Sequence, residues 1–162
     1  MRDWRYCPHC GGALQQRELA GLPRLACADI GCGFVHWDNP APVVAALVEH
    51  EGMIVLARNH AWPEKMFGLV TGFLERGEDP RQAVVREVKE ELDLDAERVT
   101  LIGAYPFTRN HEVIIAYHVV AGGTIRLNEE LAEFRRIAPD TLRDWDYGTG
   151  LAVRDWLRAR PA

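Results

Sequence analysis

The chain has 162 residues, a formal net charge of -5 and a hydrophobic share of 48%, which suffices for one globular domain with a small appendage. It contains no long run of Lys or Arg, which disfavours nucleic acid as a partner. A small anionic substrate remains possible, because bound divalent cations can reverse the local charge. No segment approaches the ~18 consecutive apolar residues of a membrane span, and the N-terminus lacks the apolar stretch of a signal peptide, so we expect a soluble, cytoplasmic protein without a membrane segment.

The cysteines are the first organised feature along the chain. All four lie near the N-terminus in two short-spaced pairs, Cys7 with Cys10 and Cys27 with Cys32. This spacing suits a tetrahedral zinc ion held by four thiolates. Each pair ends in Cys-Gly, where glycine lets the backbone turn tightly and point amides at the sulfurs.

Two disulfides are the alternative use of these cysteines, but they need an oxidising compartment that nothing else in the sequence indicates. A segment of this size is too small to hold a core without its metal. We therefore predict a structural zinc ribbon over residues 1–38 and a main domain over residues 39–162.

The main domain begins after a Pro-rich hinge at residues 37–42. Residues 42–49 form a continuous apolar run typical of a buried strand, and residues 53–58 return as a second strand after a turn. A loop is predicted over residues 59–66, and a brief strand over residues 67–70.

A Gly-rich acidic loop is predicted from Thr71 to Asp79, followed by a helix from Pro80 to about Leu92. Asp79 is suited to cap this helix, and proline is favoured at the first helical position. The predicted buried face consists of Val84, Val85, Val88 and Leu92. On the neighbouring face lie Glu87, Glu90 and Glu91.

Strands are predicted over residues 99–105 and 113–121, and a short helical or irregular acidic segment over residues 128–134. Thr149 is expected to cap a last helix over residues 150–160. The apolar stripe of that helix is expected to include Leu151, Val153 and Leu157. Strands interleaved with two or three helices predict an α/β or α+β protein.

The acidic face of the first helix carries the chemistry. Glu87 and Glu91 are one turn apart, and like charges at this spacing cost a few tenths of a kcal/mol. A hard divalent cation such as Mg2+ would turn that repulsion into a binding site. A solvated acidic face is the ordinary alternative. The loop from Gly72 to Glu78 favours the metal site, because it could bring backbone oxygens and further carboxylates next to the two glutamates.

Residues 72–94 resemble the box of the Nudix family, G-x5-E-x7-R-E-U-x-E-E-x-G-U, in which U is aliphatic. The matching positions are Gly72, Glu78, Arg86, Glu87, Val88, Glu90, Glu91 and Leu94. Asp93 replaces the last glycine, which is expected just past the helix in a left-handed conformation that Asp tolerates. The resemblance implies the Nudix fold, a mixed-sheet α+β sandwich, and a metal-dependent pyrophosphohydrolase.

The resemblance also implies a role for each box residue. The residues expected to act in catalysis are Glu78, Arg86, Glu87, Glu90 and Glu91. Glu87 and Glu91 would be the principal ligands of Mg2+ or Mn2+, joined by the backbone carbonyl of Thr71. Glu78 and Arg86 would form an ion pair that braces the loop against the helix, although a surface salt bridge of little worth is the alternative.

A further carboxylate is expected from a later loop. Glu130 is the first choice, because Glu130-Leu131 resembles a Glu-Leu pair of the zinc-ribbon NADH pyrophosphatases, and Glu129 and Glu133 are the alternatives. In the implied reaction, metal ions clamp two phosphoryl groups, and either Glu87 or a glutamate of the later loop takes a proton from water.

The combination of zinc ribbon and box resembles the NADH pyrophosphatase branch of the family. Of that branch's signature S-Q-P-W-P-F-P-x-S, only Pro106-Phe107 is retained. NADH, NAD, ADP-ribose and FAD are therefore all candidate substrates. The residues expected to contact the substrate are Phe67, Gly72, Tyr105 and Phe107, with Trp62 as a further candidate for stacking. Packing in the core or in a homodimer is the alternative for the aromatic residues.

Two other functional classes compete with hydrolysis. One is an isomerase or a mismatch-excising glycosylase on the same fold, and the other is a non-catalytic module that senses nucleotides or binds nucleic acid. A sensor is expected to have lost part of the Arg86-Glu87 or Glu90-Glu91 pairs. Both pairs are intact, which favours the hydrolase.

Overall fold

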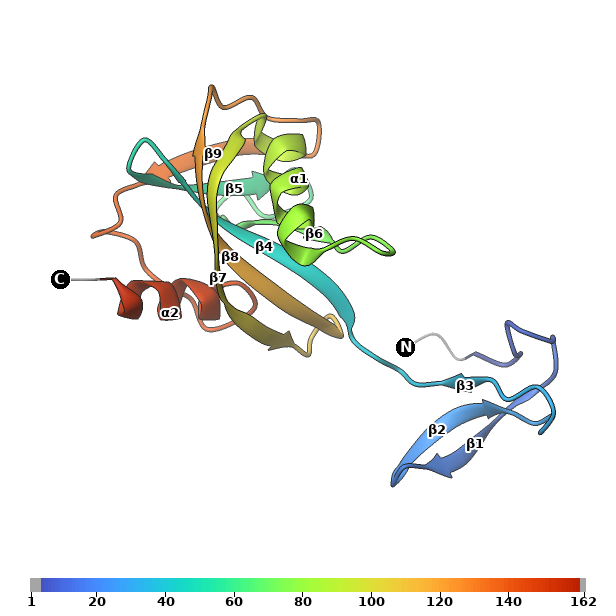
Figure 1. The fold of residues 1–162 in the computed structure, drawn as a ribbon. Coiled ribbons are helices and arrows are strands. Elements are labelled where there is room, and N and C mark those ends of the chain that lie inside the picture. The colour runs from blue at the N-terminus through green and yellow to red at the C-terminus, as the bar shows by residue number, and fades with distance from the viewer. Residues whose placement is uncertain (1–3, 161–162) are drawn as a thin grey trace. The chain divides into compact units, whose positions relative to one another are not determined.

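The computed structural model describes residues 4–160 and divides into two compact units. The first unit ends at Asn39 and the second begins at Pro40 (Figure 1). In the described part of the chain, no helix combines the length and the apolar character needed to cross a membrane.

The first unit is a small antiparallel sheet of three strands, in the order β1-β2-β3. The strands are β1 (Leu14–Leu19), β2 (Leu22–Cys27) and β3 (Val35–His36). Its buried hydrophobic residues are Cys7, Ala26 and Cys27. Because so little apolar surface is buried, the cysteines themselves form the centre of this unit.

The second unit is built on a mixed sheet in the order β7-β8-β4-β5-β9, with β6 also paired to β4. Its strands are β4 (Ala41–His50), β5 (Met53–Asn59), β6 (Val70–Phe73), β7 (Asp95–Phe107), β8 (Glu112–Gly122) and β9 (Leu131–Ile137). The central strand β4 pairs in parallel with β8 on one edge and antiparallel with β6 and β5 on the other. Such a strand is covered on both faces, which explains its continuous apolar run.

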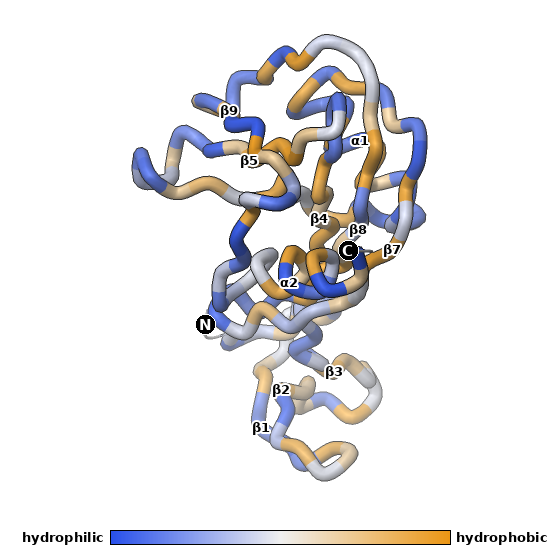
Figure 2. The backbone as a smooth tube through the Cα atoms, turned by 90° about the vertical axis from the view of Figure 1, so that its left-hand side faces the viewer, coloured by the Kyte–Doolittle hydropathy of each residue, from blue (hydrophilic) through white to orange (hydrophobic). Residues whose placement is uncertain are grey.

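One helix covers each face of this sheet, as Figure 1 shows, and this confirms the predicted α+β mixed-sheet sandwich. Helix α1 (Pro80–Leu92) packs on Val44, Ala46 and Val48 of β4. Helix α2 (Gly150–Ala159) packs with Ala45 and Leu47 of the same strand. Successive side chains of a strand point to opposite faces, so one strand supplies both cores. The apolar colouring along β4 in Figure 2 reflects this double burial.

The start of α1 agrees with its sequence signals. The side chain of Asp79 accepts hydrogen bonds from the backbone amides of Arg81 and Gln82, and Pro80 is the first helical residue. The buried apolar face consists of Ala83, Val84, Val88 and Leu92. Val85, predicted on that face, is only half-buried. Each fully buried aliphatic side chain contributes roughly 1.5–3 kcal/mol, so this face fixes the helix on the sheet.

Two other predictions are corrected by the structure, and two predicted strands are confirmed. The strand expected at residues 67–70 is Val70–Phe73, so Thr71 and Gly72 belong to β6 and not to the loop. Residues 128–134 are neither helical nor irregular throughout, because β9 begins at Leu131 and pairs with β5. The strands predicted at 99–105 and 113–121 are present and longer.

The last helix is present, but its details differ from the prediction. Thr149 occupies the N-cap position without a side-chain capping hydrogen bond. The buried residues are Gly150, Ala152, Val153 and Trp156, whereas Leu151 and Leu157 are half-buried. The core-facing stripe is therefore rotated from the predicted one.

Candidate active site

The acidic face of α1 is directed at strand β6. The carboxylate of Glu87 lies so close to the Cα of Gly72 that any Cβ at this position would overlap it. Glu87 and Glu91 are 9% and 8% exposed. A solvated acidic face would leave both side chains in water, so this arrangement fits a built site better than simple exposure.

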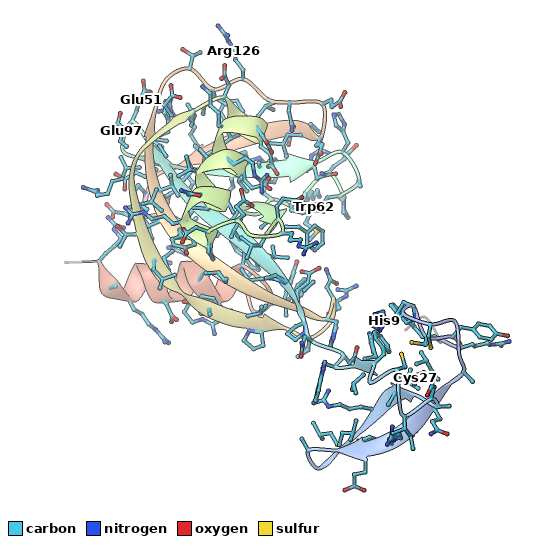
Figure 3. All side chains as sticks on the ribbon, turned by 45° about the vertical axis from the view of Figure 1, so that its right-hand side comes forward. His9, Cys27, Glu51, Trp62, Glu97 and Arg126 are labelled. Carbon is cyan, nitrogen blue, oxygen red and sulfur yellow. The ribbon has the colours of Figure 1, made fainter. Side chains whose placement is uncertain are left out.

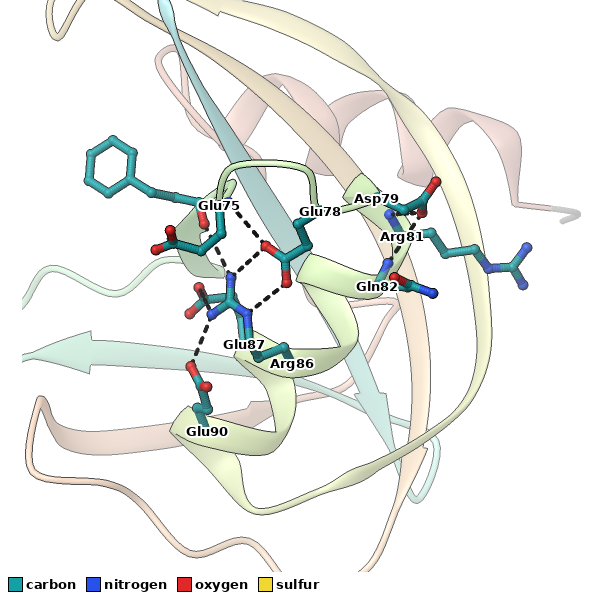
Figure 4. A network of polar contacts seen from close by, with 9 residues as sticks. Glu75, Glu78, Asp79, Arg81, Gln82, Arg86, Glu87 and Glu90 are labelled. Carbon is teal, nitrogen blue, oxygen red and sulfur yellow. Dashed lines mark hydrogen bonds and ion pairs between the residues drawn. The ribbon is translucent and has the colours of Figure 1, made fainter.

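Arg86 connects the loop and the helix (Figure 4). Its Nε and Nη2 donate to the two carboxylate oxygens of Glu78 at 2.8 and 3.0 Å. Its Nη1 donates to Glu87 at 2.6 Å and to Glu90 at 3.0 Å, and Nη2 also donates to the carbonyl of Phe73 at 3.2 Å. The planar guanidinium offers five donors in a fixed fork, which only arginine can supply.

The other side of Glu78 is fixed by the loop itself. The backbone amide of Glu75 donates to Glu78 Oε2 at 3.1 Å. The hydrogen bond from Arg86 lowers the pKa of Glu78, with a smaller contribution from the amide of Glu75. The contacts of the Glu78–Arg86 pair therefore correspond to the bracing role expected of it, since they join the loop to the helix.

The glutamates of α1 repel one another in the absence of a cation. Burial raises the pKa of Glu91 to about 8, and the charges of Glu87, Glu130 and Glu90 act in the same direction. Burial also raises the pKa of Glu87, although its hydrogen bond with Arg86 opposes this. A buried carboxyl group beside other carboxylates resists ionisation when no cation is bound. Such a group is suited to bind a cation, because the cation offsets the repulsion between the carboxylates.

Glu130 approaches the helix from the later loop. Asn128 organises this turn. Its side-chain oxygen accepts a hydrogen bond from the backbone amide of Glu130 at 3.1 Å, and its backbone amide donates to the backbone carbonyl of Glu91 at 3.2 Å. Glu130 lines the same cavity as Glu87 and Glu91. Glu133, one of the alternatives, instead pairs with Arg58 at 3.7 Å on the sheet.

The glutamates form one wall of a cavity of about 690 Å³. Of the residues predicted from the sequence, this cavity is lined by Phe67, Thr71, Gly72, Glu87, Glu90, Glu91, Phe107 and Glu130, together with Trp62. Trp62 lies in the segment between β5 and β6 (Figure 3). A cavity with carboxylates on one wall and aromatic rings on others can hold cations, a diphosphate and a planar ring together.

Tyr105, which was also expected to contact the substrate, does not line this cavity. Its hydroxyl donates to Asp155 of α2 at 2.8 Å, and its ring packs with the core beneath that helix. The cavity is also lined by Lys65, Trp145 and Tyr147, which were not predicted from the sequence. These residues lie outside the box, and only the fold brings them to it.

The departure from the box pattern at Asp93 is accommodated locally. Asp93 ends α1 in the left-handed conformation with φ 56° and ψ 25°, as predicted. Its side chain pairs with Lys89 at 2.8 Å, which lowers the pKa of Asp93. An aspartate can therefore serve where the pattern has glycine.

The four thiols of the first unit converge. Their sulfur atoms all lie within 4.8 Å of one another, with Cys7 3.7 Å from Cys32 and Cys10 3.5 Å from Cys27. A tetrahedral zinc ion with Zn–S distances of about 2.3 Å spaces its sulfurs about 3.8 Å apart, whereas a disulfide needs about 2.05 Å. The backbone amide of His9 points at the Cys7 sulfur and that of Gly12 at the Cys10 sulfur, both at 3.4 Å.

The two donor sets suit different metals. Thiolates favour Zn2+, and the four sulfurs have the spacing that this ion requires. Carboxylate oxygens favour Mg2+ or Mn2+. The α1 carboxylates are not drawn together as the sulfurs are, because Glu87 and Glu90 both turn toward Arg86. The chemistry of these carboxylates and the burial of Glu87 and Glu91 nevertheless fit a hard divalent cation.

Comparison with known proteins identifies relatives of this chain. Residues 39–156 match the family model described as the NUDIX domain. The NAD-capped RNA hydrolase NudC of Vibrio atlanticus (strain LGP32) is 32% identical over 128 residues, which cover 77% of this chain and 45% of that protein. The same-named protein of Mycobacterium tuberculosis (strain ATCC 25177 / H37Ra) is 35% identical over 125 residues, 73% of this chain and 37% of that protein. The chain thus spans less than half the length of these curated relatives.

Solved structures show the same fold. A NUDIX hydrolase from Nitrosomonas europaea has a TM-score of 0.78 at 24% identity, covering 96% of this chain and 89% of that one. A MutT NUDIX hydrolase from Burkholderia pseudomallei has a TM-score of 0.58 at 27% identity, covering 72% of this chain and 98% of that one.

Proposed function

The chain belongs to the NUDIX domain family, and on that basis we propose that it is a pyrophosphohydrolase that cleaves a nucleoside diphosphate derivative. The observation that carries the proposal is the burial of Glu87 and Glu91 against Gly72 in a cavity that also has aromatic walls. The intact glutamates favour hydrolysis over a sensor, because a sensor needs no buried, mutually repelling carboxylates.

In this proposal, Glu87, Glu91 and the backbone carbonyl of Thr71 hold Mg2+ or Mn2+, and Glu130 completes the set from its loop. The cations would stabilise charge on the phosphoryl groups of the substrate. Either Glu87 or Glu130 takes the proton from the attacking water. Arg86 keeps Glu87 and Glu90 oriented.

For the first unit we propose a structural zinc ion held by Cys7, Cys10, Cys27 and Cys32. The pKa of the Cys27 thiol is raised to about 12 by burial. A buried thiol of that kind would ionise readily only with a cation beside it, and Zn2+ supplies that charge.

The candidate substrates share a pyrophosphate flanked by at least one nucleoside: NADH, NAD, ADP-ribose and FAD. The curated relatives are named for NAD-capped RNA, so an oligonucleotide with a 5′ NAD cap is the informative further member of this group. The net charge of -5 favours the small molecules over RNA, because a long phosphate backbone needs a basic surface.

The test is identification of products from each substrate with Mg2+ or Mn2+ by mass spectrometry. We expect two phosphorylated products that mark cleavage between the phosphorus atoms, and loss of this activity in Glu91→Gln. Glu97→Gln is the matched control, because Glu97 is an exposed residue of β7 (Figure 3). Absence of turnover for every substrate would favour the sensor.

A further inference from the structure

The cavity has an aromatic end built by a segment that the metal chemistry does not use. Residues 144–149 immediately precede α2, and Trp145, Tyr147, Gly148 and Thr149 all line the cavity. Tyr147 is 49% exposed although it is a large aromatic residue. Phe107 closes this end, since its ring lies 3.6 Å from the position of a Cβ on Gly148.

This segment is held in a defined conformation. Arg154 of α2 pairs through Nε with Asp144 at 2.5 Å and through Nη2 with Asp146 at 2.6 Å. The two aspartates flank Trp145. The amide of Gly150 donates to the carbonyl of Tyr147 at 3.1 Å, and Gly150 lies so close to Trp145 that a Cβ would not fit.

The paired aspartates position the segment more than they stabilise the fold. Asp146 is 96% exposed in its side chain, and exposed ion pairs contribute little to folding stability. However, one planar guanidinium that holds the carboxylates of the residues before and after Trp145 does fix the backbone conformation of this segment. A surface ordered in advance binds a planar ligand with a smaller loss of conformational entropy.

We propose that residues 144–149 form the wall on which the heteroaromatic ring of the substrate stacks, with Tyr147 as its contact residue and Arg154 as the positioning residue. This rests on the proposed function, which places the diphosphate at the glutamates. Because the glutamates and the aromatic segment line one cavity, a nucleoside joined to that diphosphate reaches the wall.

The aromatic residues of the segment between β5 and β6 are less available. The guanidinium of Arg135 lies 3.9 Å from the centre of the Phe67 ring, and Trp62 packs on Gly68, whose Cβ position is 3.2 Å from the indole. Both rings therefore already have a partner on one face. Tyr147 is the more exposed ring, which favours residues 144–149 as the stacking wall.

The test separates the ring from the phosphate. Binding of adenosine monophosphate and of ribose 5-phosphate to the zinc-loaded chain is measured by NMR titration, and the ratio of the two dissociation constants gives the contribution of the ring. We expect the wild type to prefer the nucleotide by about tenfold or more, as for stacking on one aromatic residue. Tyr147→Ala should lower this preference about tenfold without weakening ribose 5-phosphate binding, and Tyr147→Phe should retain it.

Arg154 is tested by the same ratio. Arg154→Gln should reduce the preference and Arg154→Lys should restore part of it, since lysine keeps one ion pair. Arg160→Gln is the control, because Arg160 pairs with Asp140 at 3.1 Å without touching residues 144–149. A merely structural role for Arg154 would lower the thermal stability of Arg154→Gln and leave the ratio of the two dissociation constants unchanged.

The outcomes distinguish this inference from the proposed function. A ring preference that depends on Tyr147, in a chain that hydrolyses no substrate, would support the wall and overturn the hydrolase. Equal binding of the two probes by the wild type, or a preference lost only in Trp62→Ala and not in Tyr147→Ala, would overturn the wall whether or not hydrolysis occurs.

Discussion

The carboxylate of Glu87 lies directly against the Cα of Gly72, so that the backbone of β6 and the side chain of α1 occupy adjoining space with no room for a methyl group between them. This explains why a glycine opens the box: it lets a helix carboxylate reach the strand. The conformation of Gly72 is not left-handed, so its requirement is steric and does not arise from backbone freedom.

Gly72→Ala should therefore displace Glu87 and lower kcat by roughly a hundredfold, because a catalytic group moved by about 1 Å can lose that much. The matched control is Gly52→Ala in the β4–β5 turn. Gly52 has φ +72° and open space around it, so alanine there costs about 1 kcal/mol of stability and leaves kcat unchanged. Steady-state kinetics and thermal unfolding of both variants check this, and normal turnover in Gly72→Ala would contradict it.

Arg86→Lys should fail to replace arginine. An ammonium cannot make the two parallel bonds to Glu78 while also holding Glu87 and Glu90. We expect a loss of about 1–3 kcal/mol in unfolding free energy, because the ammonium leaves some oxygens of these partly buried carboxylates without a donor. A double-mutant cycle with Glu78→Gln should give a coupling energy of about 0.5–3 kcal/mol. Additive effects of the two changes would show that the pair is only a surface salt bridge.

Glu87→Gln and Glu91→Gln should each lower turnover roughly a hundredfold or more while the fold stays intact. In the presence of chelator, the melting temperature of Glu91→Gln should equal or exceed that of the wild type, since the amide is buried as a neutral group and cannot ionise among like charges. Added Mg2+ should raise the melting temperature of the wild type only. Near-normal turnover in both variants would remove these residues from the site.

The first unit should contain one zinc ion per chain by elemental analysis of protein purified without chelator. Cys27→Ser should lose the ion, because Cys27 is buried at the centre of the thiol cluster. Hydrogen exchange should then increase over residues 4–39 and stay unchanged in the sheet of the second unit. Four thiols that react freely with a thiol reagent in the untreated protein would contradict the zinc site.

The sequence predicts α1 well because its signals are local. Asp79 and Pro80 mark its start, and the period of its apolar residues sets its buried face. The left-handed Asp93 also follows from a local rule. By contrast, β9 was missed because Glu133, Arg135 and their neighbours put charges on an edge strand, whose extended conformation comes from pairing with β5.

The cavity shows the same division between local and distant causes. Glu87 and Glu91 are found from one helix, since residues four apart share a face. Tyr147 and Trp145 could not be found in this way, because their place in the cavity depends on α2 packing against the far face of the sheet. The position of Tyr105 outside this cavity likewise depends on the fold, since its hydroxyl donates to Asp155 of α2.

Binding of Mn2+ to the zinc-loaded chain, followed by electron paramagnetic resonance, tests the central claim most directly, because it asks whether the glutamates of α1 hold a hard cation before any substrate is considered. The wild type should bind Mn2+ in competition with Mg2+, Glu91→Gln should bind it at least about tenfold more weakly, and Glu97→Gln should match the wild type. Equal Mn2+ affinity in all three proteins would contradict the account.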